Sequence, residues 1–491
     1  MTDFNQINSS IKSYEDEYGN IHQVDILKPG TELGRGGQGV VYRTEEPNIA
    51  LKLALQKGNE IENEQDIIVF KDNIKDLLLK QVPFDVNVSI PLSVLKDKAG
   101  YVMKLLNTAK SFEKFTNTGI KDLNDYNNAG TLRLRSFALG KAASTLSRLH
   151  GMGLVYGDIS DKNIFFIPDK DDKCVIWFID ADNIDYDKKS PSIVYTPGFG
   201  APELVQQQDG IRPQSDCFAF SVLLSLVISL AHPFEGKALN QDNSDSDDFF
   251  DVDDSLAYSG QLPWIDDPDD RSNEETLKNQ GLPRDIIFTK SVHMLLEKTF
   301  CKGRIYPAAR PSIYHFVRAL IQEHDLTIKC QFCNFTLPIN PDNIESPYVC
   351  RCCDKKSDNQ FYFYFKSYRL TARGKSHIPE WFYVREFDIG SDIDIKIPCR
   401  VFQPFDNRNF DSNYLEIKKA KDRDFFTISK QPYVEEAKVY IIRKDDQGKI
   451  QNVSLNSCIV NMEDLKMSDN FSVLTINNYG YARLVDIEIR K

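Results

Sequence analysis

The sequence predicts an α+β fold that is followed by a small cysteine-rich segment and a mostly β region. Three observations predict this order. Residues 25–55 read as strands around a glycine-rich turn, and apolar residues then recur at helical spacing as far as residue 323. Alternating, aromatic-rich runs occupy residues 359–491. At about 150 residues per domain, the 491 residues allow two to four domains.

The composition limits the class of protein. With 41% hydrophobic and 27% charged residues, the chain is not disordered as a whole. A net charge of −12 makes nucleic acid and anionic membranes unlikely partners, and residues 242–275 carry 13 acidic residues and one basic residue. The longest apolar stretch, 217–231, is too short to cross a bilayer, and the polar start of the chain has no secretory signal. These features predict a cytoplasmic protein without a membrane span.

The elements are arranged in order along the chain. Residues 1–24 are polar and are expected to form an N-terminal extension. Helical periodicity predicts helices near residues 60–80, 132–150, 286–301 and 312–323. The apolar run at 216–231 predicts a buried helix with Ser215 or Asp216 as its N-cap. The acidic residues predict a surface insertion at 236–280.

A glycine-rich turn at residues 34–40, with the sequence GRGGQGV, is the first chemical motif. Glycine lets a backbone approach phosphate closely and offers N–H donors without obstruction by a Cβ atom. Ordinary turns also contain this spacing, so the glycines alone do not identify a phosphate site. Lys52 comes 13 residues after Gly39, late in a predicted strand, where its charge could meet phosphates.

Further polar residues occur at fixed spacing. Asp158 and Asn163 lie five residues apart, and Asp180-Ala181-Asp182 ends an apolar strand. The segment TPGFGAPE at residues 196–203 comes next, and Arg310 lies near the end of the helical region.

This ordered set resembles the protein kinase superfamily over about residues 25–323. The resemblance implies a bilobal kinase domain at residues 25–325, with an N-lobe at about 25–106 and a C-lobe at about 107–325. It also implies ATP, Mg²⁺ and protein substrates, because phosphoryl transfer needs positioned phosphates and a metal ion.

The resemblance assigns a role to each site residue. Gly34, Gly36 and Gly39 would cover the ATP phosphates, Val41 and Met103 would line the nucleotide site, and Lys52 would hold the α- and β-phosphates. Lys52 would pair with Glu64, with Glu60 as the rival. Asp158 would accept the substrate hydroxyl proton, Asn163 and Asp180 would bind Mg²⁺, and Glu203 would pair with Arg310.

Several positions depart from the usual kinase pattern. Tyr156-Gly157-Asp158 lacks the arginine that reads a phosphorylated activation loop, and Asp180-Ala181-Asp182 replaces Asp-Phe-Gly. Ser160 replaces a lysine that is usual in Ser/Thr kinases. The alternative is a pseudokinase that binds nucleotide as a switch or scaffold. The same departures are similar to a bacterial group of kinases, often followed by a zinc ribbon, that act in stress and phage-defence settings.

The cysteines suggest a metal site. Cys330 and Cys333, with Cys350 and Cys353, match the spacing of a structural four-thiolate zinc ribbon, expected at residues 326–358. Cys352 is a spare thiol that could replace Cys350 or Cys353. The β region at 359–491 reads as a sandwich-like module that could receive a protein activator; its ligand, the substrate and the oligomeric state stay open.

Overall fold

The computed structural model describes residues 10–490, except for 118, 171, 188–194, 241–253, 277–280, 342–347, 357–359, 389–390, 405–409, 421–425, 432–437, 445–449, 456–458, 463–469 and 478–479. Within the predicted surface insertion at 236–280, residues 241–253 and 277–280 lie outside the described residues. The prediction is wrong for part of the remainder, because Trp264 and Ile265 are buried in the core. The chain forms two compact units. The first contains the chain up to Ile120 together with Phe137–Gly281 and Met294–Val317; the second contains Lys121–Ser136, Leu282–His293 and the chain from Arg318 onward. Parts of the predicted C-lobe thus belong to the same unit as the β region.

After a two-stranded hairpin, the first unit forms an antiparallel sheet in the order β3-β4-β5-β8-β7, with the short β6 paired to β5. Its strands are β3 (Glu32–Arg35), β4 (Gly39–Arg43), β5 (Ile49–Gln56), β6 (Asn59–Glu60), β7 (Pro91–Val94) and β8 (Gly100–Lys104).

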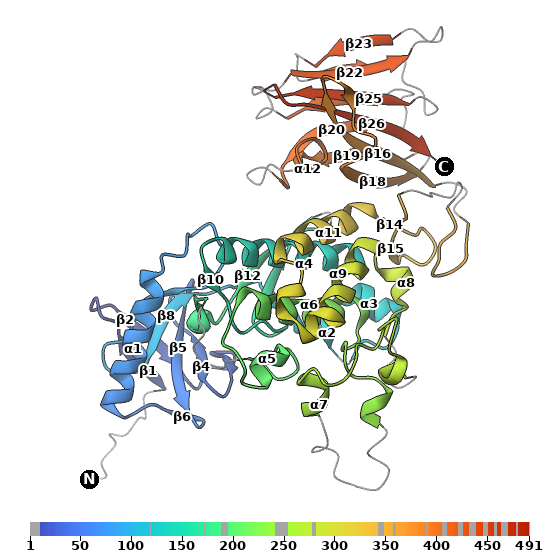
Figure 1. Ribbon diagram of the computed structural model, residues 1–491. Coiled ribbons are helices and arrows are strands. Elements are labelled where there is room, and N and C mark those ends of the chain that lie inside the picture. Colours follow the sequence, from blue (N-terminus) through green and yellow to red (C-terminus); the bar gives the residue numbers. More distant parts are fainter. Residues whose placement is uncertain are drawn as a thin grey trace, which may run out of the picture. The chain divides into compact units, whose positions relative to one another are not determined.

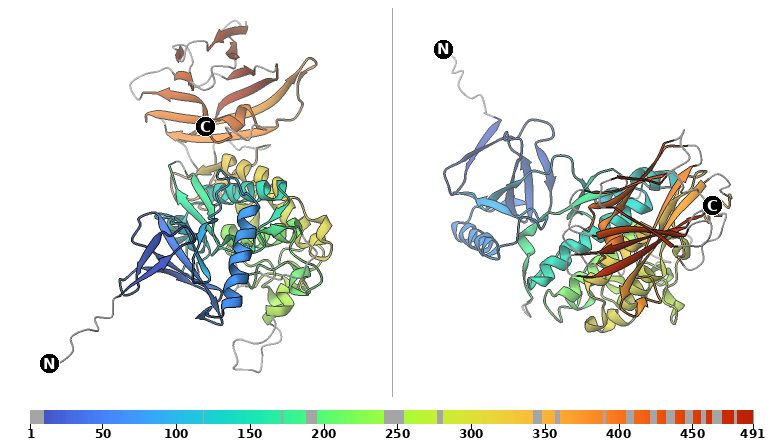
Figure 2. Two further views of the ribbon diagram at one scale, coloured as in Figure 1. Left: turned by 90° about the vertical axis from the view of Figure 1, so that its left-hand side faces the viewer. Right: turned by 90° about the horizontal axis from the view of Figure 1, so that it is seen from above.

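The two faces of this sheet have different covers, because successive strand residues point to opposite sides. Leu51 and Leu53 of β5 pack with Tyr14 and Val24 of a hairpin formed by β1 (Ile11–Glu15) and β2 (Ile21–Asp25). On the other face, Ala50 packs with Ile74 of α1 (Glu64–Leu79). Figures 1 and 2 show α1 beside the strands of this sheet. Residues 11–24, expected to belong to a polar N-terminal extension, therefore contribute to the core of the first unit.

The helix α1 confirms the prediction for residues 60–80. It begins after Asn63, whose side chain accepts hydrogen bonds from the backbone N–H groups of Gln65 and Asp66. This cap satisfies N–H donors that have no partner within the first helical turn. The negative charges of Glu64 and Asp66 in that turn interact favourably with the positive end of the helix dipole.

A buried helix, α6 (Pro213–Ser229), confirms the apolar prediction, but its predicted N-cap is wrong. The helix begins at Pro213, whose fixed φ suits a first helical position, and Arg212 is the cap. Ser215 accepts a hydrogen bond from the Arg212 N–H at 2.9 Å. Among the helices that the structure describes, none is both long and apolar enough to span a bilayer.

The other predicted helices are also present, with the 286–301 segment divided into two. They are α4 (Leu132–Gly151), α8 (Arg284–Ile287), α9 (Lys290–Phe300) and α11 (Ile313–Leu326). Shorter elements complete the helical region: β9 (Lys110–Ser111), α2 (Glu113–Thr116), α3 (Leu123–Ala129), β10 (Leu154–Val155), β11 (Ile164–Pro168), β12 (Cys174–Phe178), η1 (Ala181–Asn183), β13 (Asp185–Tyr186), α5 (Pro202–Val205), η2 (Lys237–Asn240), α7 (Asp254–Tyr258), η3 (Arg271–Asn273), α10 (Lys302–Ile305) and η4 (Pro307–Ala309).

The C-terminal part of the second unit is β-rich, as the sequence predicts. A hairpin of β14 and β15 precedes two antiparallel sheets, one in the order β17-β16-β26-β25-β22-β23 with β18 also paired to β16, the other in the order β19-β20-β21-β24. The ring centroids of Phe363 in β16 and Phe426 in β21 are 5.5 Å apart, so the two sheets pack against each other through aromatic side chains. The elements are β14 (Thr327–Lys329), β15 (Thr336–Pro338), β16 (Gln360–Thr371), β17 (Gly374–Lys375), β18 (Trp381–Asp388), β19 (Ile393–Pro398), α12 (Cys399–Phe402), β20 (Asn413–Lys419), β21 (Phe426–Lys430), β22 (Lys438–Lys444), β23 (Ile450–Ser454), β24 (Ile459–Met462), β25 (Phe471–Ile476) and β26 (Ala482–Arg490).

Candidate active site

The glycine-rich turn joins β3 to β4, and only one of its predicted phosphate-loop glycines is required by internal packing. A Cβ atom at Gly39 would lie 2.9 Å from Cε of Lys52 and 3.1 Å from the Leu53 carbonyl oxygen. At Gly34 and Gly36 an added Cβ would meet no atom within 4 Å. Gly39 therefore makes room for Lys52, while the other two leave the turn open.

Lys52 is a buried cation held by two carboxylates. Its ammonium contacts Asp180, and it lies 2.6 Å from Oδ2 of Asp182. Burial alone would lower the pKa of Lys52, but Tyr101, Asp182 and Asp180 raise it well above the ordinary value. The side chain therefore stays charged, as phosphate binding requires.

The predicted pairing of Lys52 with Glu64 is wrong in this structure. Glu64 is the first residue of α1 and its side chain is exposed. The rival, Glu60, pairs instead with Lys98 at 3.1 Å. The reason is the phase of the helix, because α1 directs Phe70 and Ile74 toward the sheet.

The predicted nucleotide-lining residues lie on the Lys52 face of the sheet. Met103 of β8 is directly opposite Ala50 of β5, two residues before Lys52. Val41 of β4 packs against the same apolar cluster, which contains Ala50 and Met103. The structure therefore brings Val41, Met103 and Lys52 to one face.

The predicted catalytic-loop residues, Asp158 and Asn163, lie in contact. Asn163 donates from its side-chain amide to the Asp158 carboxylate at 2.9 Å and to the Asp158 carbonyl oxygen at 2.9 Å. The N–H of Ile179, next to Asp180, donates to the Asn163 carbonyl oxygen at 3.0 Å. These contacts join the Asp158–Asn163 loop to the segment that carries Asp180.

Asp158 receives a hydroxyl contact that sequence reasoning missed. Thr196 donates from its hydroxyl to Oδ1 of Asp158 at 2.7 Å. Burial raises the pKa of Asp158, and the nearby Asp180 charge acts in the same direction, while the hydrogen bonds from Thr196 and Asn163 oppose the shift. A carboxylate with a raised pKa is a stronger proton acceptor.

Asp216 supports the backbone of this loop. It is buried, and it accepts backbone N–H bonds from Tyr156 at 2.9 Å and Gly157 at 3.0 Å, with His150 also at 2.9 Å. Gly157 has a φ of +86°, in the left-handed region that glycine tolerates. The sequence contained one signal for this role, a carboxylate in an otherwise apolar helix.

The predicted pair of Glu203 and Arg310 is confirmed. Arg310 donates two hydrogen bonds of 2.7 Å, one to each carboxylate oxygen of Glu203. The Arg310 side chain is fully buried, so this fork-shaped pair fixes α5 without exposure to solvent.

The second unit contains a cluster of four cysteines. The sulfur atoms of Cys330, Cys333, Cys350 and Cys353 all lie within 4.8 Å of one another. Cys330 lies 3.8 Å from Cys353, and Cys333 lies 3.8 Å from Cys350. A tetrahedron of thiolates around zinc, with bonds of about 2.3 Å, has edges of about 3.8 Å, so the donor set fits zinc. Cys352 is outside the cluster, which selects the register that the sequence left open.

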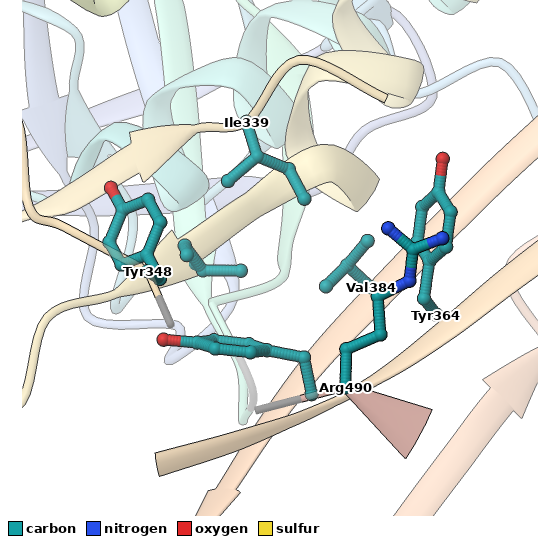
Figure 3. Close-up of a pocket in the computed structure, with 7 residues that line it drawn as sticks. Ile339, Tyr348, Tyr364, Val384 and Arg490 are labelled. Carbon is teal, nitrogen blue, oxygen red and sulfur yellow. The ribbon is translucent and has the colours of Figure 1, made fainter. Parts of the chain in front are cut away.

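A small pocket lies beside this cysteine segment (Figure 3). Ile339 and Tyr348 line one side, and Val384, Tyr364 and Arg490 line the other. Tyr364 donates to the Pro341 carbonyl oxygen at 2.7 Å, and Arg490 donates to Glu488 at 2.9 Å. These polar groups point to partners within the protein, and the pocket is an apolar packing gap.

Comparison with known proteins agrees with the geometry of the first unit. Residues 27–319, more than half of the chain, match the family model described as protein kinase domain. Similar curated proteins include ribosomal protein S6 kinase alpha-3 of Mus musculus and of Homo sapiens and ribosomal protein S6 kinase alpha-2 of Mus musculus. Each is 31% identical over 101 residues, which is 21% of this chain and 14% of the relative. The chain belongs to the protein kinase domain family.

Proposed function

We propose that this protein kinase uses ATP and Mg²⁺ to phosphorylate serine or threonine hydroxyls of proteins, itself included. The observation that carries the proposal is the contact between Thr196 and Asp158, in which an aliphatic hydroxyl donates to the carboxylate at 2.7 Å. A substrate serine or threonine would offer the same group to the same acceptor.

Asp158 is the proposed base. Its raised pKa, caused first by burial, favours uptake of the proton from the substrate hydroxyl. The hydroxyl oxygen then forms a bond to the γ-phosphorus as the bond from phosphorus to the β-phosphate oxygen breaks, and ADP leaves. Asn163 holds the carboxylate in place through its 2.9 Å hydrogen bond.

Lys52, Asn163 and Asp180 would hold the phosphates and the metal ion. Lys52 carries the buried charge expected to bind the α- and β-phosphates, with Gly34, Gly36 and Gly39 over them and Val41 and Met103 along the base. Oxygen donors from Asn163 and Asp180 are of the type that Mg²⁺ prefers. The ion would neutralise the charge that develops on the phosphates during transfer.

The second unit has two proposed roles. The four-cysteine cluster would hold a structural zinc ion. The β region would receive a protein activator. A signal received there could pass to α11, because Phe382 of β18 exchanges two hydrogen bonds with Gln322 of α11, of 2.7 and 3.1 Å. The motif resemblance to the bacterial group supports stress or phage-defence signalling as the setting.

The test is transfer of labelled γ-phosphate by the purified protein, with identification of the phosphorylated amino acids. Asp158→Asn should lower transfer by at least about a hundredfold, the lower range for a general base, and should leave nucleotide bound. Asp161→Asn is the matched control, because Asp161 lies in the same loop but accepts the Thr116 hydroxyl. Equal transfer by wild type and Asp158→Asn would contradict the assignment of the base. Bound nucleotide without transfer by wild type would favour the pseudokinase, and label on tyrosine alone would contradict the hydroxyl preference.

A further inference from the structure

The carboxylate of Asp182 uses both of its oxygens. Oδ2 lies 2.6 Å from Nζ of Lys52, and Oδ1 accepts a hydrogen bond from the Tyr101 hydroxyl at 2.7 Å. Asp182 lies in the short helix η1, two residues after Asp180. Neither the ATP contacts nor the metal ligands proposed above include it.

Tyr101 gives this carboxylate a rigid support. It is fully buried in β8, directly opposite Lys52 of β5. Its ring stacks on Phe70 of α1, with centroids 6.4 Å apart and planes 7° from parallel. A buried phenol needs a hydrogen-bond acceptor, and Asp182 supplies one. The hydroxyl therefore sets the orientation of the carboxylate that faces Lys52.

The helix α1 does not supply a carboxylate to Lys52. Its four acidic residues are all exposed, and its inward face is apolar at Phe70 and Ile74. The acidic residues are Glu64, Asp66, Asp72 and Asp76.

We propose that Asp182 is the positioning residue that holds Lys52 for phosphate binding, in the place that a carboxylate of α1 was expected to fill. The proposal rests on the nucleotide site proposed above. It explains why the third residue of Asp180-Ala181-Asp182 is acidic. Asp182, which holds the lysine, and Asp180, the proposed metal ligand, then lie on one three-residue segment. The conformation of that segment, with Asp180 at a φ of +58°, therefore fixes the positions of both carboxylates. Neither carboxylate belongs to α1, so a movement of α1 would not take either of them away from Lys52.

The first test is chemical labelling of Lys52, which needs no turnover. The groups that face its ammonium are Asp180, Asp182 and Tyr101. Asp182→Asn keeps the shape and an acceptor for Tyr101 but removes one negative charge. Acetylation of Lys52 by acetic anhydride, measured by peptide mass spectrometry, should become several-fold faster, because the ammonium loses one of the two carboxylates that hold it. Asp76→Asn, which removes an exposed charge from α1, should leave the rate unchanged.

The second test shows whether Asp182 acts through Lys52. Asp182→Asn should weaken binding of Mg·ATP about tenfold, whereas in a Lys52→Met background the same change should alter binding less than about twofold. In Asp182→Asn the buried ammonium keeps Asp180 as its one remaining carboxylate, and if this variant folds poorly the double variant avoids the cause, because Lys52→Met removes the ammonium.

Two results would overturn the proposal: labelling of Lys52 that responds to Glu64→Gln and not to Asp182→Asn, or equal effects of Asp182→Asn in both backgrounds. Neither test depends on catalysis. A protein that binds ATP without transferring phosphate would fail the Asp158 experiment and could still pass both of these, so the two failures are distinguishable.

Discussion

Asp325 and Arg400 form a fully buried ion pair in the second unit, with two hydrogen bonds of 2.7 Å from the guanidinium to the two carboxylate oxygens. Asp325 lies in α11 and Arg400 in α12. The indole N–H of Trp381 adds a third hydrogen bond to the carboxylate, at 2.8 Å. The pair therefore ties the last helix before the cysteine segment to the β region of the same unit.

Removing the guanidinium should destabilise this unit strongly. Arg400→Met removes both hydrogen bonds of the pair, and among the described residues it leaves the buried Asp325 with only the distant Arg385, at 3.9 Å, as a cation. Removing one partner costs about 3–5 kcal/mol in comparable buried pairs. Urea unfolding would measure the loss, followed by tryptophan fluorescence in a Trp177→Phe, Trp264→Phe background, in which Trp381 beside the pair is the remaining tryptophan. Arg369→Gln is the control. Arg369 is 64% exposed and shares Glu380 with Arg483, so its loss should cost less than about 1 kcal/mol. Similar midpoints for Arg400→Met and wild type would show that the pair contributes little to stability.

This ion pair also shows what the sequence could not predict. Arg400 follows an alternating strand pattern, and a charged residue in that setting is typical of a face exposed to solvent. Its partner Asp325 lies 75 residues earlier in the chain. Nothing in local spacing links the two. The pairing of Lys52 is a second gap: the 3.6-residue period predicted α1, but the choice of Glu64 came from the family resemblance, and the structure leaves Glu64 exposed at the first position of the helix. The role of Asp216 was missed for a similar reason. Its position at the start of an apolar run is typical of a helix cap, and only the fold brings the N–H groups of Tyr156 and Gly157 to its carboxylate.

The proximity of the kinase motif residues was predictable for a physical reason. Asp158, Asn163 and Asp180 lie in loops next to short strands, so the spacing along the chain limits where each side chain can lie. The fixed separation of Lys52 from Gly39 reflects their neighbouring strands, in which Gly39 must leave room for the lysine. Motifs carried by strands and tight turns thus transfer well from sequence to structure.

Glu323 should make stability depend on pH. It is fully buried, where it accepts hydrogen bonds from the Thr289 N–H at 2.8 Å and from the Ser136 hydroxyl at 3.0 Å, and burial raises its pKa from 4.5 to about 7. Between these values the folded state binds a proton that the unfolded state has released. The stability from this group is therefore present below pH 4.5 and falls as pH rises to 7, by up to about 3 kcal/mol.

The comparison of wild type with Glu323→Gln isolates this effect. The variant cannot titrate at this position, so the difference in free energy of unfolding between the two proteins should shift in favour of the variant from about pH 5 to about pH 7.5. Other groups, including the neighbouring His324, titrate in both proteins and cancel in the difference. A difference that stays constant between the two pH values would mean that Glu323 has an ordinary pKa.

We predict that the cysteine cluster binds one zinc ion, with Cys352 as the control position. Purified wild-type protein should contain about one equivalent of zinc, because four converging thiolates form a closed structural site. Cys350→Ser removes one donor and should lower both the zinc content and the thermal stability. Cys352→Ser should change neither, because Cys352 lies two residues away and outside the cluster.

Metal analysis by mass spectrometry, combined with thermal unfolding, distinguishes the two registers of the zinc site. If Cys352→Ser lost zinc and Cys350→Ser kept it, the shifted register would be the correct one. Full stability without metal in wild type would mean that the thiols pack as ordinary apolar side chains.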